Sequence, residues 1–394
     1  MGMILFDTKK GVCKVRIKAY GVGGGGSNAL NTMIGEGMNK ITFAAVNTDI
    51  QALSRSHADE KIQIGEKLTG GLGAGANPNM GRQAAEESID VINDSLEEAD
   101  ICIVIAGMGG GTGTGAAPVI AHAARQQGKM VISFVTTPFE FEGRHRGKNA
   151  LLGLDELREY SHSLIVIPND KLYSIITEDT SFVDAFRKVD MILMEAVNSL
   201  TRLILDPGMI NLDFADVRAV MSIGGQAVIT FGVGMGVNRA INAVDAALSN
   251  VLIEAKKLKG ARGLLLNVVG GADMTLHEVT NCIQKLRANI HEDANIIFGA
   301  NIDPKMNEKV MISIIATGIE ESLDSSHSIN SGIIHDRKIT PSIAPFNKIT
   351  PGNEGSSMFE SNTVHPDFDD EFDVPTYIRR SRRFKNVSSY IEND

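Results

Sequence analysis

The chain has 394 residues, of which 43% are hydrophobic and 5% aromatic, and its formal net charge is −10 at pH 7. This length allows two domains with substantial cores, and the acidic balance gives no general electrostatic reason to bind nucleic acid. Three cysteines, Cys13, Cys102 and Cys282, lie far apart without a CxxC spacing, which indicates a reducing compartment and no structural metal. No run approaches the roughly 18 apolar residues of a membrane span, so we expect a cytoplasmic protein without direct membrane insertion.

Strand-like alternation and a glycine run open the chain. Residues 14–20 alternate polar and apolar side chains, six residues rich in glycine follow at 21–26, an amphipathic stretch covers 28–38, and an apolar run covers 41–46. This order predicts a βαβ unit. The glycines fit G-x-G-x-x-G, with Asp49 about where a dinucleotide fold places its ribose acid. Alone, the pattern suits an NAD enzyme nearly as well as a nucleotide hydrolase, or a purely structural turn.

Apolar runs and helical patterns alternate through the next part of the chain. Such alternation implies a mostly parallel sheet with helices on both faces, and ligands of such sheets bind at the carboxyl ends of the strands. We expect strands at 101–106, 130–135 and 164–167, and helices at 82–96, 117–125 and 148–160.

Residues 109–115 read GGGTGTG and are the strongest local signal. Five of the seven residues are glycine, so consecutive backbone N–H groups can close on an anion, while Thr112 and Thr114 add hydroxyl donors. A helix expected from Ala116 would direct its positive N-terminal end to the same place. The segment therefore predicts a phosphate cradle.

A further glycine-rich loop at 70–78 also precedes a helical pattern. Three such loops can surround one polyphosphate, whereas an NAD site normally relies on one. The sequence has no G-x-x-x-x-G-K-[ST], which excludes a Walker-type P-loop with its lysine. Arg146 is a candidate to balance the phosphate charge, and the carboxylate of Glu142 suits ribose hydroxyls, although both also fit a solvated charge cluster at a helix start.

A long helix is predicted over 182–205, where apolar residues keep helical spacing for more than twenty residues. Phe186 and Asp190 lie one turn apart on one face of it. A phenyl ring can stack on a purine, and a carboxylate matches the N1–H and amino donors of guanine while repelling N1 of adenine. The alternative is a core Phe and a surface Asp. Asn28 would add a base contact or merely cap its helix.

The region after the long helix predicts a smaller α/β domain ending near Gly318. Within it, Asp213 and Asp216 lie three residues apart at a helix start, where they fit an N-cap and its first-turn partner. They also fit a pair that orients and polarises water for attack on a phosphoryl group. Because they are remote from the glycine loops in the sequence, a functional pair implies a site completed between two molecules. The expected helices are 215–221 and 239–248, and the expected strands are 263–269, 294–300 and 310–317.

Several of these motifs together resemble one family. Residues 109–118 look like the tubulin-signature loop in its bacterial form, and the chain is similar to the bacterial FtsZ cell-division family over roughly residues 12–319. The other segments that carry the resemblance are 47–49, 71–78, 167–172 and 211–217, and residues 373–379 resemble the docking peptide of that family.

The resemblance implies a GTPase that polymerises head to tail into protofilaments of the division ring, in the cytoplasm at mid-cell beneath the inner membrane. It implies that Asp213 and Asp216, with Asn211 alongside, act on GTP of the adjacent subunit, and that Mg²⁺ accompanies GTP or GDP; we identify no metal ligand among the side chains. Ser27 stands where many relatives have Asn or Gly, which leaves the backbone role of its loop intact. The implied nucleotide-binding residues are Gly24, Gly25, Gly26, Ser27, Asn28, Gly111, Thr112, Gly113, Glu142, Arg146, Phe186 and Asp190.

The expected fold class is α/β, with a Rossmann-like GTP-binding domain joined by a central helix to a smaller GTPase-activating domain. Beyond it the composition predicts a flexible linker and then a tail in which apolar and basic residues return. Residues 373–383 are expected to bind membrane-anchoring division adaptors, and no role is assigned to 384–394. The competing hypotheses are a dinucleotide-dependent oxidoreductase and a non-catalytic nucleotide-binding scaffold. The expected boundaries are 1–180, 181–205, 206–319, 320–371 and 372–394.

Overall fold

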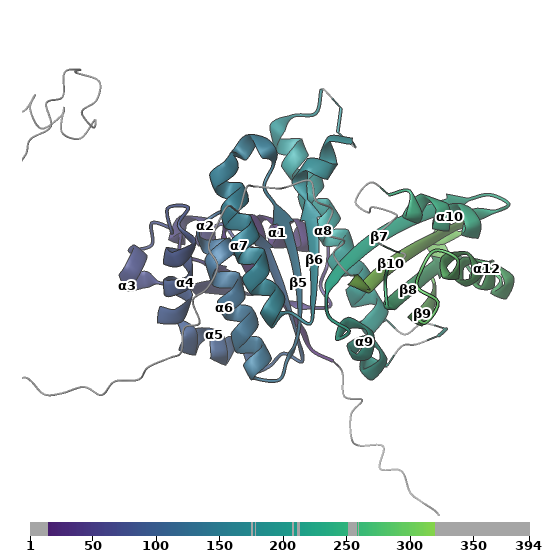
Figure 1. Ribbon diagram of the computed structural model, residues 1–394, viewed down its shortest axis with the longest axis horizontal. Coiled ribbons are helices and arrows are strands. Elements are labelled where there is room, and N and C mark those ends of the chain that lie inside the picture. Colours follow the sequence, from purple (N-terminus) through teal and green to yellow (C-terminus); the bar gives the residue numbers. More distant parts are fainter. Residues whose placement is uncertain are drawn as a thin grey trace, which may run out of the picture. The chain divides into compact units, whose positions relative to one another are not determined.

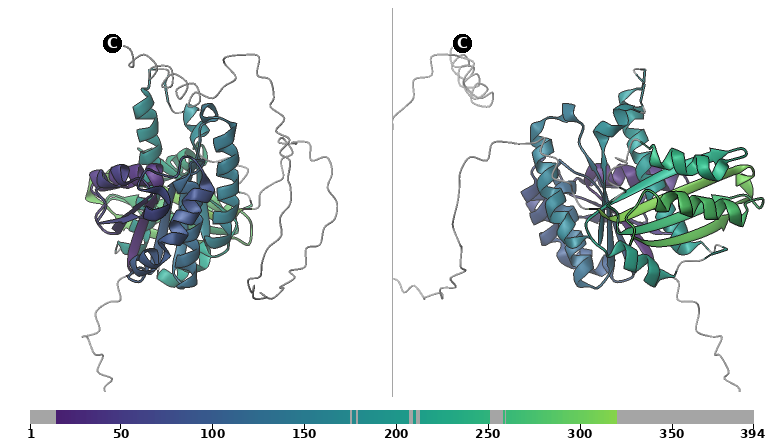
Figure 2. Two further views of the ribbon diagram at one scale, coloured as in Figure 1. Left: turned by 90° about the vertical axis from the view of Figure 1, so that its left-hand side faces the viewer. Right: turned by 45° about the vertical axis from the view of Figure 1, so that its right-hand side comes forward.

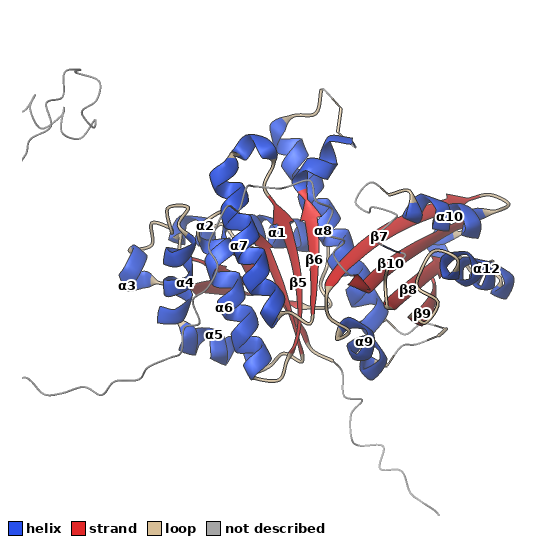
Figure 3. Cartoon of the chain, in the orientation of Figure 1, coloured by secondary structure: helices blue, strands red, loops and turns tan. Residues whose placement is uncertain are grey.

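A ten-stranded sheet organises the chain (Figures 1 and 3), with the strand order β3-β2-β1-β4-β5-β6-β7-β10-β8-β9. The computed structural model describes residues 15–174, 176–177, 179–206, 209–210, 213–250, 258 and 260–319. The linker and tail expected at 320–371 and 372–394 lie outside these residues, as does Asn211. In the part of the chain that the structure describes, no helix is long and apolar enough to cross a bilayer.

The first six strands are all parallel, as the sequence predicted. Their order reverses between β1 and β4, because β2 and β3 lie on one side of β1 and β5 and β6 on the other side of β4. Open parallel sheets bind ligands in the crevice outside the carboxyl ends of the strands at such a reversal. The strands are β1 (Ile17–Val22), β2 (Thr42–Asn47), β3 (Glu60–Gln63), β4 (Ile101–Gly107), β5 (Met130–Thr137) and β6 (Ser163–Pro168).

Helices cover both faces of this parallel part (Figure 2), which is why its central strands are apolar throughout. Ile103 and Ile105 of β4 pack into a cluster with α1 and α8, whereas Val104 and Ala106 pack into a second cluster on the opposite face. On the first face lie α1 (Gly23–Gly35) and α8 (Phe182–Leu205); on the second lie α4 (Pro78–Glu87), α5 (Ile89–Leu96), α6 (Thr112–Gln126) and α7 (Arg144–Tyr160). Short helical segments are α2 (Ile50–Ser54), α3 (Glu66–Thr69), η1 (Glu140–Glu142), η2 (Asn169–Ser174) and η3 (Pro304–Met306).

The second part of the chain continues the same sheet. Strand β7 (Gln226–Met235) runs parallel to β6 through two register pairs, Leu164 with Gln226 and Ile165 with Ala227, which we call the β6–β7 seam. Beyond it β10 (Lys309–Ile319) runs antiparallel to both β7 and β8. The remaining elements are α9 (Phe214–Met221), α10 (Arg239–Leu248), β8 (Gly263–Gly270), α12 (Leu276–Arg287) and β9 (Asn295–Ile302).

Two expectations about secondary structure were wrong in detail. The helix predicted at 82–96 is interrupted at Ser88, whose hydroxyl accepts a hydrogen bond from the backbone N–H of Gly65 at 3.0 Å, and it forms the separate helices α4 and α5. The glycine run expected as a loop at 21–26 lies in β1 and the first turn of α1. Strands β3 and β7 and helix α12 were not predicted from the sequence.

Close packing accounts for glycine in the first turn of α1. A Cβ at Gly26 would lie 2.3 Å from the carbonyl oxygen of Ile105 in β4 and 2.8 Å from the carbonyl carbon of Gly21. Both neighbours are backbone atoms, so they cannot move aside as a flexible side chain can. Glycine at this position therefore allows α1 to lie directly on the sheet.

We predict that Gly26→Ala lowers the free energy of unfolding by about 1–3 kcal/mol, because it overpacks the contact between α1 and β4. Gly35→Ala, at the other end of the same helix, is the matched control, because a Cβ there would meet no atom within 4 Å. Its effect should be neutral or slightly stabilising, since alanine favours helix. Chemical denaturation of both variants measures the difference, and equal stability of the two would contradict the packing argument.

Candidate functional site

The three glycine-rich segments meet at the carboxyl edge of the parallel strands. A Cβ at Gly23, which follows β1, would lie 2.8 Å from the backbone nitrogen of Gly113 in α6. A Cβ at Gly111 would lie 2.8 Å from Cβ of Ala74 and 2.9 Å from the backbone nitrogen of Asn77, both in the 70–78 segment. The structure thus brings together loops that are far apart in the sequence, on both sides of the reversal between β1 and β4.

Two helix N-termini form the centre of this arrangement. Helix α6 begins at Thr112 rather than at the predicted Ala116, and within 109–115 only Gly109 has a positive φ, of 101°. No side chain of the described residues caps either α1 or α6. The unpaired N–H groups of both first turns and the positive ends of both helix dipoles therefore remain available to an anion.

The threonine hydroxyls of this segment also stabilise the turn through contacts within the protein. Thr112 Oγ1 lies 2.7 Å from Thr48 Oγ1, and Thr114 Oγ1 accepts a hydrogen bond from the backbone N–H of Gly109 at 2.8 Å. All three threonine side chains are buried. Thr48 lies in the 47–49 segment that carries the family resemblance, but its contact with Thr112 was not predicted, because the two residues are 64 positions apart.

Glu142 and Arg146 lie beside this turn. A Cβ at Gly109 would come within 2.9 Å of the backbone oxygen of Arg146, so the start of α7 packs on the turn. The Glu142 carboxylate accepts a hydrogen bond from the backbone N–H of Phe139 at 2.9 Å and forms an ion pair with Arg146. Because a carboxylate has about four acceptor positions, this pairing leaves Glu142 able to accept further donors.

Phe186 and Asp190 reach the same edge from α8. The ring of Phe186 meets the ring of Phe139, which follows β5, edge-on with centroids 5.4 Å apart. Asp190 is half-buried, and its carboxylate accepts no hydrogen bond from the described residues. Burial raises its pKa to about 7. Asn28 lies exposed within α1, whose N-cap is Val22, so the interpretation of Asn28 as a cap was wrong.

Two buried polar atoms at this edge lack a partner among the described residues. They are Oγ of Ser27, in the first turns of α1, and Oδ1 of Asn169, directly after β6. Buried polar groups are nearly always hydrogen-bonded, so unpaired ones call for a ligand or water. Together with the open helix N-termini, they fit a polar, anionic ligand.

Asp213 and Asp216 lie at the other end of the molecule. Asp213 is the N-cap of α9 and accepts a hydrogen bond from the backbone N–H of Asp216 at 2.8 Å, which confirms the capping interpretation, and both side chains are exposed. Helix α9 leads into the start of β7, which pairs with the start of β6, and therefore lies at the amino edge of the sheet. Since α8 rises about 1.5 Å per residue, Asp190 and the end of α8 at Leu205 are roughly 22 Å apart.

Comparisons with known proteins agree with this architecture. A model described as the Tubulin/FtsZ family, GTPase domain, matches residues 16–177, and one described as the FtsZ family, C-terminal domain, matches residues 225–320. An empty FtsZ dimer from M. jannaschii is 41% identical, with a TM-score of 0.73 over 77% of this chain and 88% of that chain. CetZ1 from Haloferax volcanii, solved as a GDP-bound monomer, is 21% identical, with a TM-score of 0.68 over 78% of this chain and 95% of that chain, and shows likeness of fold alone.

We predict that the stability of the nucleotide-free protein falls as the pH rises from about 4 to about 7. The pKa of Asp190 in the folded state exceeds the unfolded value near 3.9, so between these two values the folded state holds a proton on Asp190 that the unfolded state has released. The free energy of unfolding therefore falls as the pH rises through this range. Asp190→Asn cannot ionise and should be more stable than wild type at pH 8, on the order of 2 kcal/mol after allowance for partial exposure. Denaturation at pH 5 and pH 8 measures this, with Asp94→Asn on the exposed face of α5 as control.

Proposed function

The chain belongs to the tubulin/FtsZ family of GTPases, and on that premise we propose that it hydrolyses GTP at contacts between copies joined head to tail in a division filament. A GTPase of the cytoskeletal type follows from the family itself. The protofilament, the division ring and the shared site are our proposal. The structures compared are archaeal, and the bacterial assignment stays a prediction.

One observation carries the proposal: the phosphate-binding features and the acidic pair lie at opposite edges of one sheet. The open N-termini of α1 and α6 lie at the carboxyl edge, and Asp213 and Asp216 lie at the amino edge, next to the start of β7. Within one copy the length of the sheet and of α8 separates these groups. A second copy placed end to end would join them, and the FtsZ relative from M. jannaschii was solved as a dimer.

We propose that GTP and GDP bind across the reversal between β1 and β4. The backbone N–H groups of α1 and α6 would hold the phosphates, and the unpaired Ser27 hydroxyl lies in the first of these turns. The residues concerned are Gly24, Gly25, Gly26, Ser27, Asn28, Gly111, Thr112 and Gly113. Mg²⁺, bound with the phosphates, would neutralise the charge that develops on them during phosphoryl transfer.

The nucleoside would lie toward α7 and α8. The remaining acceptor positions of Glu142 suit the ribose hydroxyls, and Arg146, ion-paired with Glu142, would add positive charge near the phosphates. Phe186 would stack on the base, held in place by its edge-on contact with Phe139. Ionised Asp190 would accept the N1–H and amino donors of guanine, which supplies the partners that this half-buried carboxylate lacks.

Hydrolysis would require the amino edge of the next copy. Asp213 and Asp216 are exposed there and can accept hydrogen bonds from a water molecule, orienting it toward the terminal phosphate of the neighbour. Asn211, which lies outside the described residues, would assist as an amide donor or acceptor. Assembly would thus contribute to catalysis by placing fixed carboxylates, rather than bulk water, around the attacking water molecule.

Further parts of the proposal concern the organisation and placement of the chain. We propose a GTP-binding domain over 1–180, a connecting helix over 181–205 and a GTPase-activating domain over 206–319. A linker over 320–371 would hold a tail at 372–394 that binds membrane-anchoring adaptors through residues 373–383. The protein would then form the division ring in the cytoplasm beneath the membrane.

The decisive experiment measures GTP hydrolysis per molecule against protein concentration, with sedimentation of the same samples. We predict that the rate per molecule rises with polymer mass, because each site needs two copies. A dilute monomer that hydrolyses GTP as fast as concentrated protein would refute the shared site. Nucleotide binding without hydrolysis at any concentration would favour the scaffold hypothesis.

The sharpest variant for that experiment is Asp213→Asn. Asparagine is as good an N-cap as aspartate, so α9 should stay intact while the carboxylate is lost, whereas Asp213→Ala also removes about 1 kcal/mol of capping. Asp213→Asn should bind GTP normally, lose hydrolysis by at least about 100-fold, and suppress turnover in mixed filaments with wild type. Asp303→Asn, an N-cap of η3, is the control and should leave turnover unchanged.

Base recognition gives an independent prediction. Asp190→Asn should weaken GTP binding more than binding of inosine triphosphate, which lacks the exocyclic amino group and therefore already forfeits one of the two donors. The expected difference is about tenfold in Kd, the value of one hydrogen bond to a charged group. Titration calorimetry with both nucleotides checks it; equal losses for both would remove Asp190 from the base contact.

A further inference from the structure

The outer face of α7 carries a row of exposed side chains. The helix runs along β5 and β6 (Figure 1), with its buried residues toward the sheet and α6. At about 100° per residue, six exposed residues share an arc of about 100° on the opposite side. The other exposed residues of α7, His145 and Arg146, contact Asn149 and Glu142 beside the glycine turn. We call the six residues the α7 stripe; they are Arg144, Lys148, Leu151, Leu152, Asp155 and Glu159.

The charges of the α7 stripe are arranged symmetrically about its centre. Its N-terminal half carries two cations and its C-terminal half two carboxylates. Between them, Leu151 and Leu152 are 64% and 70% exposed. Each cation has a carboxylate equally far from the midpoint between the leucines on the other side. The matched positions are Lys148 with Asp155 and Arg144 with Glu159. A second α7 laid antiparallel about this midpoint would therefore meet opposite charge at every charged position and leucine at the centre.

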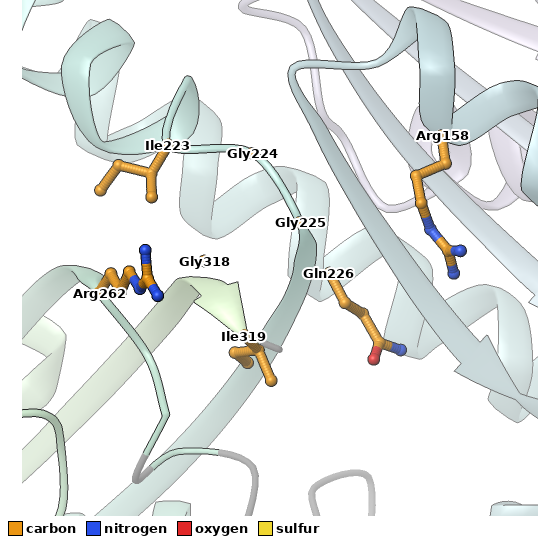
Figure 4. A pocket seen from close by; sticks show the side chains of 8 residues that line it. All are labelled: Arg158, Ile223, Gly224, Gly225, Gln226, Arg262, Gly318 and Ile319. Atoms are coloured by element: carbon orange, nitrogen blue, oxygen red, sulfur yellow. The ribbon is translucent and has the colours of Figure 1, made fainter. Parts of the chain in front are cut away.

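The contacts that the stripe already makes leave it accessible. Oδ1 of Asp155 lies 3.5 Å from Nη1 of Arg158, and the side chain of Asp155 is 72% exposed. Because a carboxylate has about four acceptor positions, it can accept a further cation. Arg158 is not part of the stripe, because it lines a pocket at the β6–β7 seam together with Gln226 (Figure 4).

We propose that the α7 stripe is a contact between two copies of this chain, in which two α7 helices pack antiparallel about a two-fold axis. Lys148 of each copy pairs with Asp155 of the other, and Arg144 of each copy pairs with Glu159 of the other. The four leucines pack together at the centre and exclude water, with the ion pairs as a polar rim. Because both copies use the same surface, the contact closes on itself.

A single contact of this kind is weak. The stripe is roughly 22 Å long and about 10 Å wide, so each copy buries far less than the roughly 800 Å² of a stable interface. In a filament every copy presents the same stripe, and the contacts reinforce one another along its length. The two-fold axis reverses the direction of α7, so the paired filaments run in opposite directions. This last step rests on the head-to-tail filament of the proposed function.

The first test exchanges the charges of one matched pair. Lys148→Glu and Asp155→Lys, each alone, place like charges opposite each other, and the double variant restores opposite charges. The two positions lie two turns, or roughly 10 Å, apart on one helix, so restoration requires a second copy. With GTP, the paired filaments collected by low-speed sedimentation should fall at least threefold in each single variant. The double variant should recover at least half of the loss.

High-speed sedimentation, which collects all filaments, and GTP turnover should stay unchanged in these variants. Asp94→Lys, on the exposed face of α5, makes the same charge change as Asp155→Lys and should leave pairing unchanged. Pairing of the wild type should weaken in 0.5 M NaCl, because exposed ion pairs are screened. Wild-type filaments that do not pair, single variants that pair like wild type, or a double variant no better than the single variants would overturn the proposal.

The second test needs no filament and therefore separates this contact from the proposed function. In a Cys13→Ser chain, whose other two cysteines are buried, Lys148→Cys is mixed with Asp155→Cys and oxidised, with and without GTP. The mixture should give at least about fivefold more disulfide-linked dimer than either variant alone, because only unlike positions come within the roughly 6 Å between Cα atoms that a disulfide needs. Lys148→Cys mixed with Asp94→Cys measures random collisions.

Equal yields from all these mixtures, both with and without GTP, would overturn the contact. A specific cross-link in a protein that forms no filaments with GTP would support the contact and refute the filament alone.

Discussion

Close backbone contacts at a few glycines determine how the helices pack at the carboxyl edge of the sheet. A Cβ at Gly115 of α6 would lie 1.9 Å from the carbonyl oxygen of Pro78 at the start of α4, and one at Gly26 of α1 would lie 2.3 Å from that of Ile105. Neither contact tolerates a side chain. With glycine there, α6 packs directly on α4 and α1 packs directly on β4, and both α1 and α6 begin at the reversal of the strand order. The glycines of these segments are therefore required first for close packing. They affect ligand binding because this packing positions the helix N-termini.

The same close packing explains which strands could be predicted from the sequence and which could not. Continuous apolar strands such as β4 and β5 were predicted almost to the residue, because burial on both faces leaves a clear pattern. Strand β7 was missed, and its glycines are the reason: a Cβ at Gly232 or Gly234 would lie 2.0 or 1.8 Å from a carbonyl oxygen of α10. Glycine weakens the strand pattern where close packing requires it. The signal that remained was the alternation of Ala227, Ile229, Phe231 and Val233.

The site shows a similar division. Its candidate residues were proposed from motifs, whereas the contacts between them were not predicted. The pair Thr48 and Thr112 joins residues 64 positions apart, and Phe139 supports Phe186 from a different element. Such contacts follow from the strand order, which a pattern in one segment does not specify. The half-buried position of the Asp190 carboxylate is likewise visible only once α8 is placed against the sheet, and burial there raises its pKa to about 7.

The distribution of the core residues has a consequence for synthesis. The cluster on the face of α4 to α7 is built entirely from residues between Tyr20 and Val166, whereas the cluster on the other face needs α8, up to Leu203, and residues as late as Ile315. At the roughly 5–20 residues per second of translation, one face of the nascent sheet closes about 2–8 s before α8 emerges to cover the other. The nascent sheet would therefore expose one apolar face to a ribosome-associated chaperone. Slow translation between β6 and the end of α8 would prolong the exposure of that face.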